Sequence, residues 1–193
     1  MHLSSALLLG LGPAGLLATA ATRAAAADGV PIGERSAQEV VAQLNLVPNS
    51  EKGYYVQSFE DGDRVIRTSP CGAVPAGPSA TATRSASTAI YYLLEGADGD
   101  SIWHRVDAAE VWHYYAGAPL TLSLSRDDGL PYNVTVLGPD IFAGQIPQLA
   151  IPKHVWQSAR SLGNWTLVGT TVAPGFVFEG VELAPPDWTP RGP

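Results

Sequence analysis

Ser101-Ile-Trp-His-Arg-Val-Asp-Ala-Ala-Glu-Val-Trp-His-Tyr-Tyr-Ala-Gly117 is the stretch on which the fold prediction depends. Titratable side chains alternate in it with large aromatic ones. Such alternation is typical of a β-strand that has one face on a core and the other on a site or on water. Residues 107–109 have the composition of a turn. The stretch is therefore predicted to form a strand, a turn and a second strand.

Short predicted strands flank this stretch on both sides, and turn-forming residues separate them. The chain has 20 Gly and 16 Pro residues, so it turns often, and residues 60–79 are predicted to form a long polar loop. Evenly spaced short strands are typical of a β-sandwich or β-barrel, so the predicted fold class is all-β. Further strands are expected at residues 53–59, 88–94, 120–125, 132–137, 148–152, 155–159, 165–172 and 176–178.

A single helix is predicted, near the N-terminal end of the domain. Ser36 and Glu39 have the spacing of a capping box, in which each side chain accepts a hydrogen bond from the other residue's backbone N–H. Apolar residues follow on one helical face, and Pro48 ends the pattern. The helix is therefore expected to pack on the outside of a sheet. The apolar positions are Val40, Val41, Leu44 and Val47.

The composition indicates one acidic globular domain. Apolar residues make up 46% of the 193 residues, enough to fill a core, and charged residues make up 15%. The net charge is −7, and the eleven Lys and Arg residues are scattered along the sequence. A nucleic-acid-binding surface needs clustered basic residues, and a spanning helix needs about 20 strongly apolar ones. Neither nucleic acid nor a membrane is therefore expected as a partner.

The two ends of the chain differ from the domain between them. Residues 1–28 contain an apolar run followed by small residues, as in a secretory signal peptide; the alternative is a disordered Ala-rich extension. Secretion is the expected localisation, with the cytoplasm as the alternative. Residues 36–184 are assigned to the folded domain, and residues 185–193 to a Pro-rich, poorly ordered tail. Cys71 is the only cysteine, so no internal disulfide can form.

The central stretch resembles the first motif of the cupin superfamily. His104, Glu110 and Gly117 fall at the positions of that motif, and Val106 occupies the place of its second His. The second motif is matched more weakly, between Gly144 and Gln157, with Gln157 at the place of its last His.

The chain is more closely similar to one subfamily, the small Cupin-5-type cupins of unknown function. The resemblance implies a cupin double-stranded β-helix, or jelly roll, that is often dimeric, and some relatives are similar to sugar-nucleotide epimerases. Here Ser50-Glu-Lys-Gly53 replaces the more usual Gly-Gly before a Tyr pair, so the substrate need not be the same. The hallmarks are Gly53-Tyr-Tyr55, Arg84-Ser85, 88–94, Trp103-His-Arg105, Glu110-Val-Trp-His113, Gly144-Gln145, Trp156-Gln157 and 172–176.

Metal-binding cupins hold a divalent ion with about three His and one Glu. This chain keeps His104 and Glu110 but lacks two of those His, and Gln157 offers only a neutral amide oxygen. Strand alternation places His113 on the opposite face from Glu110. No cofactor and no metal site is therefore assigned, and a divalent ion at His104 and Glu110 is the alternative.

The expected function is binding of a small organic molecule, as a metal-independent enzyme of epimerase, isomerase or lyase type acting on a sugar or natural-product-like substrate. His104 and Glu110 are the predicted catalytic pair, on adjacent strands where their side chains meet across the ladder inside the barrel, near Gln157. Two alternatives stay open. One is that the protein is a non-catalytic ligand-binding or storage cupin, and the other is that His104 and Glu110 make only a structural hydrogen bond.

Eight further side chains are predicted to bind the substrate. Arg105 suits an anionic group, but alternation sets it opposite His104, where a surface salt bridge to Asp107 or Glu110 is the alternative. A homodimer is expected as well, because pairing across a two-fold axis covers the edges of jelly-roll sheets. The predicted substrate-binding residues are Tyr55, Tyr92, Arg105, Trp112, His113, Gln145, Trp156 and Gln157.

Overall fold

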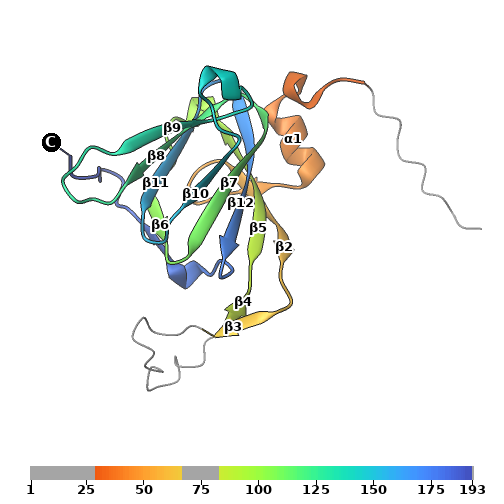
Figure 1. Cartoon of the computed structure of the whole chain (residues 1–193). Helices are drawn as coiled ribbons and strands as arrows, with labels where there is room; N and C mark the ends of the chain where they lie inside the picture. Colours follow the sequence, from red (N-terminus) through yellow and green to blue (C-terminus); the bar gives the residue numbers. More distant parts are fainter. Residues whose placement is uncertain (1–28, 67–82, 193) are drawn as a thin grey trace, which may run out of the picture.

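Two antiparallel sheets face each other and form a barrel, shown in Figure 1. The computed structural model describes residues 29–66 and 83–192. The predicted signal peptide, Cys71 and most of the predicted 60–79 loop lie outside the described residues. Within them, the predicted all-β jelly roll with one helix on its outside is confirmed.

The larger sheet has six strands in the order β1-β2-β5-β12-β7-β10, and the smaller has five in the order β13-β6-β11-β8-β9. A two-stranded β3-β4 sheet extends β2 and β5 beyond the barrel (Figure 1). The six strands are β1 (Val47–Pro48), β2 (Tyr54–Glu60), β5 (Thr88–Glu95), β12 (Trp165–Ala173), β7 (Ala109–Gly117) and β10 (Gln148–Ile151). The others are β13 (Val181–Leu183), β6 (His104–Val106), β11 (Trp156–Ser161), β8 (Leu120–Ser125), β9 (Asn133–Leu137), β3 (Arg64–Ile66) and β4 (Thr83–Ser85).

The predicted strand, turn and strand at the centre of the sequence are β6 and β7. The two strands do not pair with each other, because the turn between them carries the chain from the smaller sheet to the larger one. β6 pairs with β11 and β13, whereas β7 pairs with β10 and β12. The expectation that His104 and Glu110 meet across one ladder is therefore wrong: they lie on opposite sheets and both line the cavity between them.

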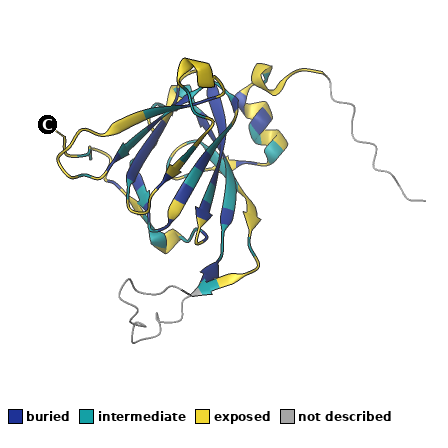
Figure 2. Cartoon of the chain, viewed as in Figure 1, coloured by how far each residue is buried: buried dark blue, intermediate teal, exposed yellow. Residues whose placement is uncertain are grey.

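Strand alternation fills the space between the sheets with apolar side chains, and Figure 2 shows the buried positions running along the strands. Trp112 is 2% exposed and makes an edge-to-face contact with Tyr92, with ring centroids 6.0 Å apart. The smaller sheet supplies fully buried leucines to the same core. Its buried members are Tyr92, Leu94, Trp112, Leu120, Leu122, Leu137, Ile151, Ala159 and Val168.

Helix α1 (Ala37–Leu44) packs against the outer face of the larger sheet, as predicted. Its capping box is formed: the Ser36 hydroxyl accepts from the backbone N–H of Glu39 at 3.3 Å, and Glu39 accepts from that of Ser36 at 2.9 Å. Asn45, with a left-handed φ of 54°, ends the helix before Pro48. The Trp165 indole donates to the Arg35 carbonyl at 2.8 Å and fixes the start of the helix on β12.

The segment after β12 differs from the prediction. Residues 176–178 are not a strand: the backbone N–H groups of Gly175 and Phe176 donate to the Ser85 carbonyl at the end of β4 and to the Thr88 hydroxyl at the start of β5. The strand comes later, as β13, which the sequence analysis missed. The short 3-10 helices are Ile32–Glu34, Gly96–Asp98, Ile141–Ala143 and Phe178–Gly180.

The Pro-rich tail contacts the barrel through Trp188 and Arg191. Trp188 packs on Trp156 with ring centroids 4.4 Å apart, and on Trp103 at 5.9 Å. Arg191 donates to both carboxylate oxygens of Asp127, each at 3.2 Å. Trp188 therefore covers part of the outer face of the smaller sheet, at Trp156 on β11.

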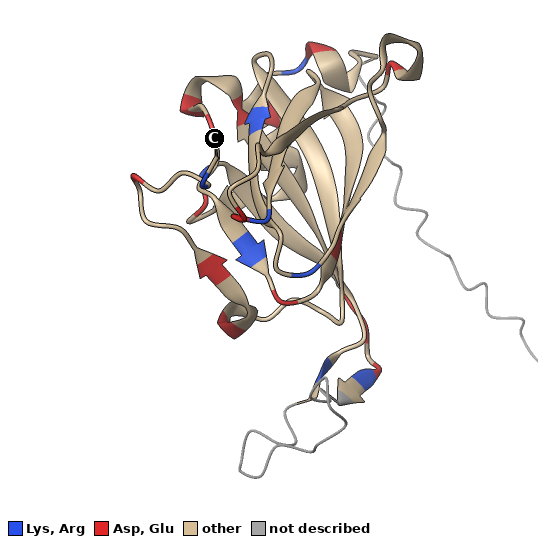
Figure 3. Ribbon diagram, turned by 60° about the vertical axis from the view of Figure 1, so that its left-hand side comes forward, with Lys and Arg blue, Asp and Glu red and all other residues tan. Residues whose placement is uncertain are grey.

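Lys and Arg positions are scattered around the barrel rather than gathered in one stripe, as Figure 3 shows for the described residues. No helix in the described ranges is long and apolar enough to cross a membrane.

Candidate functional site

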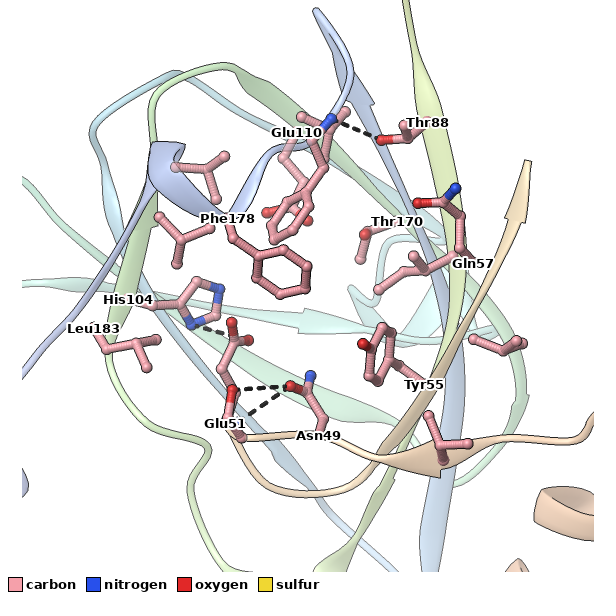
Figure 4. A pocket seen from close by; sticks show the side chains of 18 residues that line it. Asn49, Glu51, Tyr55, Gln57, Thr88, His104, Glu110, Thr170, Phe178 and Leu183 are labelled. Atoms are coloured by element: carbon pink, nitrogen blue, oxygen red, sulfur yellow. Dashed lines mark hydrogen bonds and ion pairs between the residues drawn. The ribbon is translucent and has the colours of Figure 1, made fainter. Parts of the chain in front are cut away.

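A cavity of about 390 Å³ opens between the sheets, and Figure 4 shows its lining. Strands of both sheets contribute to it, together with the segments before β2 and after β12. The cavity thus collects side chains that are far apart in sequence. The lining residues are Val47, Asn49, Ser50, Glu51, Tyr55, Val56, Gln57, Thr88, Ile90, His104, Val106, Glu110, Thr170, Val172, Phe176, Phe178, Val181 and Leu183.

His104 lies on β6, buried to 5% exposure, and its ring faces the cavity. Its Nδ1 lies 3.0 Å from the Ile102 carbonyl oxygen, which can only accept. We therefore assign the proton of the neutral ring to Nδ1, which leaves the lone pair on Nε2. In Figure 4 the Nε2 side of the ring points into the cavity.

Glu51 reaches the same end of the cavity from the segment between β1 and β2. Its Oε2 lies 3.4 Å from His104 Nδ1, and its side chain is 16% exposed. Burial raises the pKa of Glu51; the neighbouring His104 lowers it and the Glu110 carboxylate raises it further. The Asn49 side-chain oxygen accepts from the Glu51 backbone N–H at 3.3 Å and fixes this segment. Glu51 and His104 therefore form a close acid–base pair.

Glu110 lines the cavity from β7 and is held from behind by a buried hydrogen-bond chain. Gln157 Nε2 donates to Glu110 Oε2 at 2.5 Å, and Trp112 Nε1 donates to Gln157 Oε1 at 3.1 Å. Gln157 is 1% exposed and pairs in register with His104 on β6. Neither Gln157 nor Trp112 lines the cavity. Gln157 therefore positions Glu110, and the Trp112 indole holds Gln157 in place.

The opposite wall offers uncharged polar groups. In Figure 4 Tyr55, Gln57 and Thr170 lie across the cavity from His104 and Glu51. Among the described residues, no side chain or backbone group makes a hydrogen bond with the hydroxyls of Tyr55 and Thr170. Both hydroxyls are thus available to a ligand.

The remaining predicted binding residues lie outside this cavity. Tyr92 is in the core, where its hydroxyl donates to the Lys52 carbonyl at 2.9 Å, and burial raises its pKa well above the ordinary value. His113 faces outward from β7, stacked on Tyr115, as the alternation predicted. Gln145 closes a surface loop by accepting from the Asp140 backbone N–H at 3.1 Å.

Arg105 and Trp156 are also outside the cavity, on the outer face of the smaller sheet. The Arg105 guanidinium lies 4.7 Å from the Trp156 ring centroid and pairs with Glu182 at 2.6 Å. Arg105 therefore makes a surface salt bridge, which was the alternative to substrate binding, but its partner is Glu182. Asp107, one of the two expected partners, pairs instead with Arg84 at 2.8 Å. Arg105 is not among the residues that line this cavity.

The side chains at the usual metal positions do not match the metal-binding cupin donor set. Only His104 and Glu110 remain of it, and Val106 supplies no donor. The Gln157 oxygen is directed to the Trp112 indole, so it does not replace a ligand. Within residues 29–66 and 83–192, no group of three or more His, Cys, Asp or Glu side chains is arranged to hold a metal ion.

Glu51 is the functional candidate that the sequence analysis missed. Its signal was the Ser50–Gly53 segment, where a charged pair replaces the usual Gly-Gly. Phe176 and Phe178 were missed as well, since residues 176–178 were predicted to be a strand. Only the return of the chain from β12 brings these rings to the cavity.

The comparisons with known proteins agree with this architecture. Residues 38–184 match the family model Cupin_5, described as Cupin superfamily (DUF985). A hypothetical protein from Leishmania major is 26% identical, with a TM-score of 0.64 over 77% of this chain and 86% of that one. A Shewanella oneidensis protein of known crystal structure is 29% identical, with a TM-score of 0.63 over 78% and 85%. No curated protein matches the sequence. Because the family model covers most of the residues, the chain belongs to the Cupin_5 family (DUF985) of the cupin superfamily.

Proposed function

We propose that this cupin binds a small organic molecule in the cavity and catalyses a proton transfer on it without a metal, as an isomerase, epimerase or lyase. The observation that supports this proposal is the convergence of His104, Glu51 and Glu110 on one cavity of about 390 Å³. A volume of this order suits a small ligand. Titratable groups with opposed roles at one site are typical of acid–base catalysis.

The geometry suggests a role for each group. His104 Nε2, with its lone pair toward the cavity, is placed to take a proton from a substrate C–H or O–H. Glu51, whose pKa is raised by burial, keeps a proton at higher pH than an exposed Glu and is placed to return one. Glu110, held by the hydrogen bond from Gln157, is the acceptor that orients a substrate hydroxyl or amine. Tyr55 and Thr170 hold the far side of the molecule through their hydroxyls.

Deuterium exchange tests the proposal without a known substrate. A panel of small hydroxy-ketones, aldoses and enolisable ketones is incubated with the protein in D₂O, and proton NMR measures exchange at the acidic C–H. We expect exchange above the protein-free rate for at least one compound, with a loss of about 100-fold or more in His104→Ala, since a general base contributes on that order. Glu110→Gln should also be impaired.

His113→Ala is the matched control, because His113 lies on the outer face of the same barrel, stacked on Tyr115. It should exchange at the wild-type rate. If a compound shifts cavity resonances but is not exchanged, the protein is a ligand-binding cupin and the catalytic proposal is wrong. Equal loss in His104→Ala and His113→Ala would also contradict the assignment of the site.

A further inference from the structure

The charged groups that line the cavity are all acidic, apart from one imidazole. Among its described lining residues there is no Lys or Arg; the carboxyl groups of Glu51 and Glu110 and the imidazole of His104 are its acid–base groups beside the Tyr55 phenol. Their summed charge becomes positive only if both carboxyls and the imidazole are protonated together. The cavity therefore disfavours a negative ligand near neutral pH, where charges in a partly dry site interact strongly.

The basic side chains adjacent to cavity residues in sequence are engaged elsewhere. Lys52 follows Glu51, but its ammonium donates to the carbonyls of Asp98 and Asp100 at 2.8 and 2.7 Å. Arg105 follows His104, yet it is paired with Glu182 on the outside of the barrel. Neither side chain can neutralise a phosphate or carboxylate in the cavity without leaving these partners.

The other part of the cavity is apolar. Val106, Val172 and Phe176 line it and belong to one apolar cluster, and the Phe176 and Phe178 rings meet edge to face with centroids 5.3 Å apart. Phe178 lines the cavity although it is 74% exposed, so it forms an apolar rim that a ligand can cover. Ile90 adds to this wall from β5.

We infer that the ligand is an organic molecule with an apolar body and a polar end that is neutral or positively charged, such as an alcohol, a carbonyl compound or an amine, and not an anion. This inference depends on the proposed function only in that the cavity must bind a small molecule. The polar end lies at Glu51, His104 and Glu110, and the apolar body lies against Phe176, Phe178 and Ile90. Nucleotide sugars, phosphorylated sugars and carboxylates are thereby disfavoured.

The test compares three probes of the same shape and different charge: 2-phenylethylamine, 2-phenylethanol and phenylacetate. Dissociation constants are measured at pH 7 by ligand-detected NMR and by shifts of the cavity methyl resonances of Ile90 and Val172. We expect the amine and the alcohol to bind and phenylacetate to bind at least about tenfold more weakly than either, because it brings a like charge next to Glu110. In Glu51→Gln and in Glu110→Gln that ratio should shrink severalfold.

Glu182→Gln is the matched control, since it removes a carboxylate from β13 that points outward to Arg105. It should leave the ratio unchanged. If phenylacetate binds as tightly as the amine, or if neither Glu variant alters the ratio, the inference is wrong while the cavity stays a ligand site. If none of the three probes shifts the cavity resonances at millimolar concentration, the inference fails together with the binding step of the proposed function.

Discussion

Replacing Gln157 with Leu should destabilise the fold more than any surface substitution of the same kind. Gln157 is 1% exposed and joins the Trp112 indole N–H to the Glu110 carboxylate through bonds of 3.1 and 2.5 Å. Leu has a similar volume, so packing changes little. The Trp112 indole and the Glu110 carboxylate nevertheless each lose a hydrogen bond, and Trp112 is only 2% exposed.

The magnitude follows from the two lost bonds. The buried indole N–H left without an acceptor costs about 1–3 kcal/mol. The carboxylate loses a charge-assisted bond worth about 1.5–3 kcal/mol, part of which water restores, because Glu110 borders the cavity. We therefore expect a loss of about 2–4 kcal/mol in the free energy of unfolding, which lowers the Tm by about 5–15 °C for a domain of this size.

Urea unfolding and calorimetry measure this loss, with Gln148→Leu as the matched control. Gln148 is exposed on β10, so its replacement should change stability by less than about 0.5 kcal/mol. A double-mutant cycle isolates the indole bond. In a Trp112→Phe background the cost of Gln157→Leu should fall by about 1 kcal/mol or more, because the donor is already gone. Equal stabilities of Gln157→Leu and Gln148→Leu, or a fully additive cycle, would refute the reasoning.

Three other outcomes are expected. Gly53→Ala should lower the Tm more than Gly99→Ala. Both glycines have a positive φ, of 69° and 72°, but only at Gly53 would the added Cβ meet a backbone oxygen, that of Leu93 at 2.3 Å. Equal losses of Tm in the two variants would contradict this. Burial raises the pKa of Glu51, so its contribution to stability is present below its unfolded pKa of about 4.5 and is lost as the pH rises through the folded value. The Tm difference between Glu51→Gln and wild type should therefore grow in favour of the variant from about pH 4 to pH 7, and a constant difference would count against the raised pKa. Light scattering at micromolar concentration should give the mass of a dimer, and a monomer would argue against edge pairing.

Local patterns in the sequence determined most of the barrel. The alternation in 101–117 requires strands, since a period of two places Glu110 and Trp112 on one face and His113 on the other. That face assignment is independent of which strands become neighbours. The capping box at Ser36 likewise determined where the helix begins, because both of its hydrogen bonds are made within four residues.

Pairing between distant strands is what the sequence left open. No local pattern shows that the turn after β6 changes sheets, so His104 and Glu110 were expected on one ladder, whereas in the structure they lie on opposite sheets and line one cavity. For the same reason the sequence predicted that Gln157 binds the substrate, whereas in the structure it is buried and donates a hydrogen bond to Glu110. Register depends on the packing of both sheets at once.

Glu51 shows most clearly the difference between what local sequence predicts and what only the tertiary structure decides. The sequence marked the Ser50–Gly53 segment as unusual but gave the glutamate no partner, because the segment is more than 50 residues from His104 along the chain. Only the pairing of β1 with β2 at the edge of the larger sheet, with Glu51 in the turn between them, brings the Glu51 carboxyl to 3.4 Å from the imidazole. Composition and periodicity determine which faces are buried, whereas the contacts that give a buried charge its chemistry arise from long-range closure of the barrel.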